Sequence, residues 1–116
     1  MNSYVTASLL DEARNGRRAV AITGTMAAAQ ASFREAAQMA PDAERVYRAN
    51  GRERVTFAGG GELRFLSARC GGHRGLSADT VFIDWDAFES ADQYRTLYSE
   101  VAPIVAASAT GKVVRA

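Results

Sequence analysis

Hydrophobic positions recur at two different spacings along the chain, one typical of helices and the other of strands. Apolar residues three and four positions apart predict helices over about 3–15 and 26–39, and a third helix that begins near Ser90. Residues 19–23 and 80–84 are short apolar runs with β-branched side chains, a pattern that favours buried parallel strands. Because helix, strand and helix open the chain in this order, an α/β layer fold is expected.

Residues with strong preferences at helix ends set the expected bounds of these helices. Ser3 and Thr25 are good N-caps for the first and second helix, and Pro41 closes the second. In the third helix, Pro103 introduces a kink or begins a new turn, and Gly111 ends the helix.

Between the second and third helix the period changes to two, which is typical of strands. Residues 45–49 and 53–57 alternate on either side of an Asn-Gly pair, the strongest short signal for a hairpin turn. Residues 62–67 alternate again after three consecutive glycines. We therefore expect an antiparallel β-meander over about 45–67.

Length, composition and charge limit the class of protein. The chain has 116 residues, of which 47% are hydrophobic and 23% are charged, so a single globular domain over residues 1–116 is expected. The formal net charge of +1 removes the simplest argument for nucleic-acid binding. No apolar run approaches the roughly 20 residues of a membrane helix. We expect a cytoplasmic location.

A single cysteine and a single histidine exclude most catalytic and metal sites that depend on these residues. Cys70 and His73 are three positions apart in a glycine-rich loop that has no second ligand pair, so a zinc site is a weak alternative. Of the 14 basic residues all but Lys112 are arginine, which we interpret first as the codon bias of a GC-rich genome.

The strand predicted at 80–84 ends in an acidic residue. A carboxylate at the carboxyl end of a parallel strand can hold Mg²⁺ in enzymes that act on nucleotide phosphates, so Asp84 and Asp86 are weak candidate metal ligands. The alternative is a buried strand followed by solvated or helix-capping acids. The acids grouped around this strand end are Asp79, Asp84, Asp86, Glu89 and Asp92. Beside them, Trp85 and Phe88 are either core residues, which we expect, or an exposed anchor for a partner.

The order of these segments resembles the ATPase domain of bacteriophage large terminase subunits, the DNA-packaging motors, and more loosely the helicases that share their core. Residues 16–25, followed by a helix with Gln30, are similar to the second core strand of those motors. Residues 55–69 resemble their antiparallel insertion, and residues 73–79 resemble the turn before the Walker B strand. The resemblance covers nearly the whole chain and implies that Asp84 matches the Mg²⁺-binding, cofactor-binding aspartate of that motif.

The resemblance implies a single α/β domain built as a three-layer sandwich with a mostly parallel sheet, in which the β-meander is an insertion. This is the fold of a truncated P-loop NTPase core. In the motors, the strands that match 19–23, 80–84 and 113–115 lie side by side, with the P-loop strand beyond the last. The same order leaves residues 112–115 at an open sheet edge, which favours self-association or pairing with another chain.

The departures from the family argue against catalysis. A P-loop reads G-x-x-x-x-G-K-S/T, with backbone amides and a lysine that hold the phosphates, and this sequence contains no such motif. The only lysine, Lys112, is near the carboxyl-terminal end of the sequence, whereas the P-loop would lie at the amino-terminal end. The family has a glutamate after the Walker B aspartate to orient the attacking water, but Trp85 stands at that position and can do no proton chemistry. The chain as it stands is therefore not expected to be an enzyme.

The predicted meander is locally basic, although the whole chain is not. Its acids are Glu44, Glu53 and Glu62. Seven arginines in the meander and the loop after it are candidates for binding a nucleic-acid backbone. They are Arg45, Arg48, Arg52, Arg54, Arg64, Arg69 and Arg74. The alternative is a solvated hairpin face in an arginine-rich protein.

Together these observations predict a non-catalytic, phage-encoded binding or interaction module that acts on DNA or on a packaging or replication protein. One alternative is a split ATPase subunit of a packaging motor that needs a P-loop from another chain. Another is a structural remnant that forms a homo-oligomer through the edge at 112–115. No cofactor is expected apart from weakly held Mg²⁺, and no membrane partner is expected.

Overall fold

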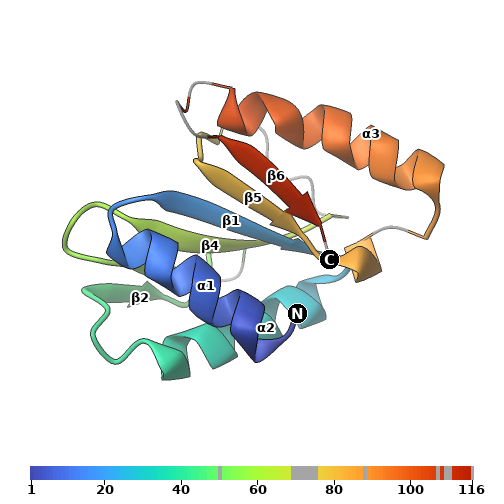
Figure 1. Ribbon diagram of the computed structural model, residues 1–116. Helices are drawn as coiled ribbons and strands as arrows, with labels where there is room; N and C mark the ends of the chain where they lie inside the picture. Colours follow the sequence, from blue (N-terminus) through green and yellow to red (C-terminus); the bar gives the residue numbers. More distant parts are fainter. Residues whose placement is uncertain (50, 69–75, 88, 107, 109–110, 116) are drawn as a thin grey trace.

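The computed structural model describes residues 1–49, 51–68, 76–87, 89–106, 108 and 111–115 (Figure 1). Helices and strands follow one another nearly as the hydrophobic pattern predicts. In chain order they are α1 (Ser3–Arg14), β1 (Arg18–Thr23), α2 (Met26–Met39), β2 (Arg45–Tyr47), β3 (Arg54–Thr56), β4 (Glu62–Ser67), β5 (Thr80–Ile83), the 3₁₀ helix η1 (Trp85–Ala87), α3 (Ala91–Val101), the 3₁₀ helix η2 (Ala102–Val105) and β6 (Lys112–Arg115).

The six strands form one mixed sheet in the order β2-β3-β4-β1-β5-β6. β4, β1, β5 and β6 are parallel, whereas β2 and β3 pair antiparallel at one edge, and β3 is also antiparallel to β4. The α/β class and the mostly parallel sheet are therefore confirmed. β1, β5 and β6 lie side by side as expected, and β6 is an edge strand.

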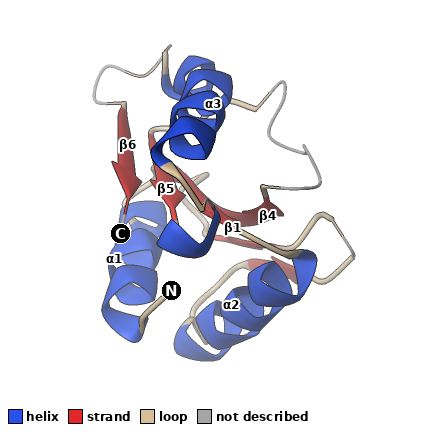
Figure 2. Ribbon diagram, turned by 90° about the vertical axis from the view of Figure 1, so that its right-hand side faces the viewer, coloured by secondary structure: helices blue, strands red, loops and turns tan. Residues whose placement is uncertain are grey.

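Helices lie on both faces of the sheet (Figure 2). α1 and α2 cover one face, where Leu10, Phe33 and Phe65 belong to the same buried cluster. α3 and η2 cover the other face over β1 and β5, where Ile22 and Leu97 belong to a second cluster. β1 and β5 are buried on both faces, which explains why 19–23 and 80–83 are largely apolar runs.

The helix starts agree with the expectations except at the first helix. Asn2, not Ser3, is the N-cap of α1, because its Oδ1 accepts a hydrogen bond from the Val5 N–H at 2.9 Å. The Ser3 hydroxyl instead donates to Glu35 on α2, at 2.7 Å. Thr25 caps α2 as predicted, accepting from the Ala28 N–H at 3.1 Å.

Three elements end earlier than their patterns predict. α3 ends at Val101 and continues only as η2, because Pro103 has no N–H and its ring clashes with a continuing α-helix. Gly111 is therefore not the end of this helix. The hairpin strands are limited to Arg45–Tyr47 and Arg54–Thr56, because the ladder between them stops at the pair Tyr47 and Arg54. In the connection between these two residues, the Arg52 N–H donates to the Ala49 carbonyl at 2.9 Å. Within the described ranges, no helix has the length and apolar character needed to cross a bilayer.

Candidate nucleic-acid interface

Strand register places Tyr47 and two of the predicted DNA-binding arginines in one row across the antiparallel part of the sheet. Tyr47 on β2 pairs with Arg54 on β3, and Arg54 pairs with Arg64 on β4. Directly paired residues project from the same face of a sheet, so the three side chains share one face. The next partner in the row, Val20 on β1, belongs to the core beneath α3. The row therefore extends the α3 side of the sheet.

Four of the predicted arginines converge on one pocket beside this row. The pocket has a volume of about 390 Å³ and is lined by Tyr47, Arg48, Ala49, Arg52, Arg54 and Arg64. Arg45 stands beside it, and its Nη1 donates a hydrogen bond of 3.4 Å to the Tyr47 hydroxyl. We call Arg45, Arg48, Arg52, Arg54 and Arg64, together with Tyr47, the arginine face. Arg69 and Arg74 lie outside the described residues.

Two guanidinium groups lie close to the Tyr47 ring. The guanidinium carbon of Arg54 lies 4.0 Å from the ring centroid and that of Arg45 lies 5.6 Å from it, within the range of cation–π attraction. Hydrogen bonding from Arg45, and secondly from Arg54, lowers the pKa of the Tyr47 phenol below its ordinary value. The ring is thus fixed in a strongly positive environment.

Positive charge is only partly neutralised on this face. Arg54 and Arg64 are directly opposite each other, an arrangement of like charges that destabilises a sheet. They share one carboxylate, Glu62, at 3.9 Å and 3.6 Å respectively. The Nε atoms of both arginines are buried and have no hydrogen-bond partner among the described residues. The incompletely compensated positive charge favours the binding of an anion.

A second pocket lies on the α2 side of the same hairpin. We call it the Glu53 pocket; its volume is about 230 Å³ and it is lined by Gln30, Phe33, Arg34, Arg48 and Glu53. Glu53 is 1% exposed, and its Oε1 accepts a hydrogen bond from the Gly51 N–H at 3.2 Å. Its Oε2 is buried and has no hydrogen-bond partner within the described part of the chain. Arg48 lines both pockets and lies with its guanidinium carbon 5.7 Å from the Phe33 ring centroid.

The sequence contained a signal for the Glu53 pocket that the charge count missed. Glu53 is in phase with Val55 and Phe57, both of which face the core. With a period of two, a glutamate in phase with core residues is expected to be buried. Alternation at this position therefore predicts an inward-facing carboxylate.

The two candidate metal ligands lie near the carboxyl end of β5 but have different partners. Asp84 follows β5, is 5% exposed, and its Oδ2 is 2.8 Å from the amino nitrogen of Met1. Asp86 is exposed in η1, and its Oδ1 accepts from the Gly24 N–H at 3.1 Å. Among the described residues, no three His, Cys, Asp or Glu side chains are grouped to hold a metal ion. A cation at Asp84 and Asp86 stays a prediction.

The remaining acids do not all gather where they were expected. Asp79 precedes β5 and lies at its amino end, where it accepts hydrogen bonds from the Arg18 N–H at 2.9 Å and the Ser108 hydroxyl at 2.7 Å. Glu89 and Asp92 do line a pocket with Asp86, between η1 and α3. These acids lie on different elements from the arginine face.

Trp85 is not a core residue. It begins η1, which turns away from β5, and it is 71% exposed. The expectation of burial is therefore wrong, because the strand ends at Ile83 and the next residues no longer alternate into the core. Phe88, Cys70 and His73 lie outside the described residues.

Comparison of the chain with protein-family models, with curated proteins and with solved structures found no match. The resemblance to the terminase motors therefore stays a prediction that depends on the order of short motifs. Function has to be inferred from the two pockets and the charges around them.

Proposed function

We propose that this protein is a nucleic-acid-binding module without catalytic activity, and that the arginine face holds the phosphate backbone. The observation that carries the proposal is the convergence of Arg48, Arg52, Arg54 and Arg64 with Tyr47 on a single pocket. Guanidinium groups present several N–H donors in a plane that matches phosphate oxygens. A tyrosine among them offers an aromatic surface on which a base can stack.

Energetics support an anionic ligand on this face. Arg54 and Arg64 share the single carboxylate of Glu62, so one positive charge of the pair is left without a close partner among the described residues. Positive charges on two directly paired residues repel each other, and solvent screens this repulsion less where the side chains are partly buried. A bound phosphate would offset this repulsion, which supports an anionic ligand at the arginine face.

We also propose the finer fold assignment that the resemblance implies, a three-layer terminase-like core with β2, β3 and β4 as its meander insertion. The adjacency of β1, β5 and β6 supports it. In such a core the sequence has no phosphate-binding loop, and Trp85 replaces the water-orienting glutamate. Binding without hydrolysis, to DNA or alongside a packaging or replication protein, is the function that remains.

Fluorescence anisotropy with labelled duplex and single-stranded DNA tests the proposal. Affinity should fall as salt rises, because each neutralised phosphate releases counterions and contributes about −0.9 to the slope of log K against log salt for duplex DNA. Arg54→Ala and Arg64→Ala should each weaken binding by roughly three- to tenfold and reduce that slope by about one.

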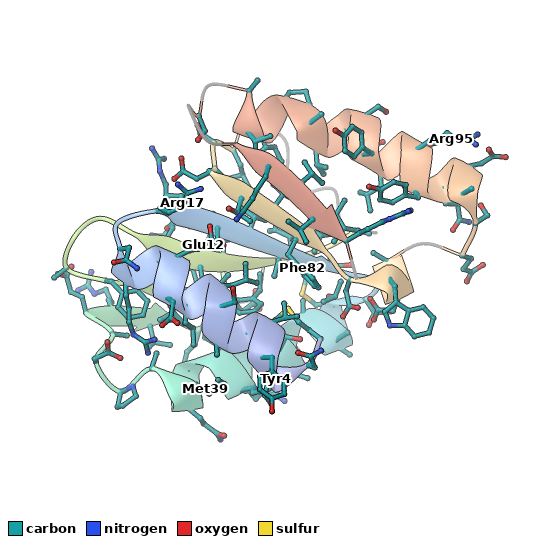
Figure 3. All side chains as sticks on the ribbon, in the orientation of Figure 1. Tyr4, Glu12, Arg17, Met39, Phe82 and Arg95 are labelled. Atoms are coloured by element: carbon teal, nitrogen blue, oxygen red, sulfur yellow. The ribbon has the colours of Figure 1, made fainter. Side chains whose placement is uncertain are left out.

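Arg95→Ala is the matched control. Arg95 lies on α3, away from the arginine face, and contacts Asp92 at 2.8 Å (Figure 3). The Arg95→Ala substitution removes one positive charge from a different surface, so the affinity of this variant for DNA should equal that of the wild type. A wild-type protein that binds no DNA at low salt, or an Arg95 variant as weak as the Arg54 variant, would refute the proposal.

A second candidate function is self-association through β6. A groove of about 360 Å³ lies between α1 and this edge strand, and its lining includes Tyr4, Leu9, Phe82 and Val114. Tyr4, labelled on α1 in Figure 3, and Val114 on β6 are exposed hydrophobic side chains. An open edge beside an apolar groove is suited to a strand from a second copy.

A further inference from the structure

We propose that the Glu53 pocket receives one unpaired base of a single-stranded nucleic acid and prefers cytosine to thymine there. This inference rests on the proposed binding of nucleic acid by the arginine face. It adds the form of the ligand, a single strand, and a residue that reads the base, Glu53.

The starting observation is a buried acceptor that the described residues leave unsatisfied. Glu53 Oε1 is bound by the Gly51 N–H, but Oε2 has no hydrogen-bond partner among the described residues, and the side chain is 1% exposed. A buried carboxylate oxygen without a donor is strongly unfavourable, and such groups are uncommon in folded proteins. A ligand that brings an N–H to Oε2 would remove this penalty.

The other lining residues decide which kind of donor fits. Arg34 and Arg48 line the same pocket, so a metal ion or a cationic side chain would be repelled by two guanidinium groups. A ligand that carries a neutral N–H donor together with an anionic group would instead be attracted, because the two arginines attract the anionic group. Phe33 adds apolar surface to the pocket. A nucleotide unit combines these three features: a flat base, N–H donors on its edge and a phosphate.

The position of the pocket favours a single strand over a duplex. The Glu53 pocket is on the α2 side of the hairpin and the arginine face is on the other side, and Arg48 at the end of β2 lines both pockets. A ligand that contacts both must bend around the end of the hairpin. Duplex DNA is stiff over about 150 base pairs, and its bases are stacked and paired inside the helix, whereas a single strand is flexible and its bases are free to enter a pocket.

The hairpin end also lies at the edge of the sheet where ligands bind in open α/β folds. Phe65 N–H on β4 donates to the Glu53 carbonyl at 3.0 Å, which places the start of β3 beside the carboxyl-terminal half of β4. Crevices outside the carboxyl ends of parallel strands are the usual ligand sites of such sheets. The pocket thus occupies an expected location for a bound nucleotide.

Carboxylate chemistry sets the base preference. Cytosine presents an exocyclic amino group that glutamate can accept from, and thymine presents a carbonyl oxygen at the same ring position. The carbonyl would face Oε2 as a second acceptor and be repelled.

The test compares labelled oligo-dC and oligo-dT of equal length by anisotropy at pH 8, with the intact protein. Wild type should bind oligo-dC roughly tenfold more tightly than oligo-dT, with the same salt slope for both. Glu53→Gln should bring the ratio close to one, because an amide can donate to the thymine carbonyl as well as accept from cytosine. Glu44→Gln is the control, since Glu44 is exposed on the same hairpin and the substitution removes the same charge.

The possible outcomes separate this inference from the proposed function. Equal wild-type affinity for oligo-dC and oligo-dT, with a steep salt slope, overturns the base preference and leaves the arginine face supported. A wild-type protein that binds neither overturns both. A Glu53→Gln protein that keeps its fold by circular dichroism and keeps the tenfold preference also overturns the role of Glu53. If that variant does not fold, the ratio of wild-type affinities for oligo-dC and oligo-dT still tests the base preference.

Discussion

At the scale of single residues, Asp79 shows how one carboxylate ties together distant parts of the chain. It accepts from the Arg18 N–H at the start of β1 and from the Ser108 hydroxyl before β6. The hydrogen bond from Ser108, and then that from Arg18, lower the pKa of the Asp79 carboxyl below its ordinary value of 3.8. Three strands therefore depend on its ionised form.

The sign of the pKa shift predicts the pH dependence of this contribution. Because the folded pKa is depressed, the stabilisation is present above about pH 4 and disappears as pH falls through the folded pKa. Asp79→Asn should lower the free energy of unfolding at pH 7 by about 0.5–1 kcal/mol, a value limited by solvent exposure. Urea unfolding at pH 7 and pH 3 checks this. The difference between wild type and variant should shrink at pH 3, and a constant difference would contradict the role of the charge.

Gly61 is a residue whose missing side chain allows two elements to touch. A Cβ at this position would lie 1.8 Å from the Ala13 carbonyl oxygen on α1 and 2.9 Å from the Arg17 carbonyl oxygen. The backbone atoms cannot move aside without separating α1 from the start of β4. Gly61→Ala should therefore lower the free energy of unfolding by more than about 2 kcal/mol.

Gly59→Ala is the control for this prediction, because a Cβ there meets only the Gly16 Cα, at 3.9 Å. Its unfolding free energy should stay within about 0.5 kcal/mol of wild type, the usual range for a surface substitution. Chemical denaturation of both variants gives the comparison. Equal destabilisation by the two substitutions would mean that flexibility of the glycine turn, and not the contact with α1, determines the cost.

At the scale of elements, β6 is the edge strand to which a strand from a second copy could be added. Lys112 N–H donates to the Asp79 carbonyl at 3.0 Å, so in this parallel pair the N–H groups of Lys112 and Val114 point to β5. The N–H groups of Val113 and Arg115 therefore point to the open edge. Pairing with a second copy would use these outward groups.

This geometry identifies the substitution that tests self-association. Val113→Pro removes an outward N–H and leaves the hydrogen bonds to β5 in place, so it should convert a β6-paired dimer to monomer. Val113→Ala loses similar packing but keeps the N–H, and it should remain a dimer. Light scattering across a concentration series measures both. A Val113→Pro protein that still dimerises would exclude pairing through this edge.

At the scale of the whole molecule, positive and negative groups are separated although the net charge is only +1. Arginines converge at the β2–β3 hairpin, whereas Asp86, Glu89 and Asp92 line a pocket between η1 and α3. An anionic ligand is therefore directed to the hairpin and away from the end of β5. This separation is a reason to expect nucleic acid at one site and no nucleotide at the other.

ATP with Mg²⁺ should neither bind nor be hydrolysed. The sequence contains no phosphate-binding loop motif, and in the proposed terminase-like core Trp85 would stand at the position of the water-orienting glutamate. Trp85 is the only tryptophan and is exposed beside Asp84, so its fluorescence reports on this end of β5. Titration calorimetry and Trp85 emission should both be unchanged by ATP and Mg²⁺. Saturable heat together with a Trp85 response would instead support the split-ATPase alternative.

Much of the fold could be predicted because its signals are local. The runs at 19–23 and 80–83 are apolar except for Thr23 and Thr80, and the strands they form are covered on both faces. Thr25 caps α2 as its residue type suggests. The predicted N-cap of the first helix was wrong, because two neighbouring residues are both suited to that position. Asn2 and Ser3 are both good caps, and tertiary contact with Glu35 engages the Ser3 hydroxyl.

The candidate site could be predicted only in part. Arginine density along 45–64 was visible in the sequence, but the convergence of Arg48, Arg52, Arg54 and Arg64 depends on strand register. Burial of Glu53 followed from alternation that the charge count had ignored. Exposure of Trp85 depends on where β5 ends, which no pattern in the sequence specified.

The sequence by itself determined the elements, their order and the α/β class, because hydrophobic period and capping chemistry act over a few neighbouring residues. The tertiary structure alone decided which side chains from different strands lie side by side and which charges meet. Pairing of β2, β3 and β4 aligned Tyr47, Arg54 and Arg64 in one row, and packing against α2 enclosed Glu53. Those outcomes depend on contacts between segments far apart in the chain, where register and burial, not local preference, set the free energy.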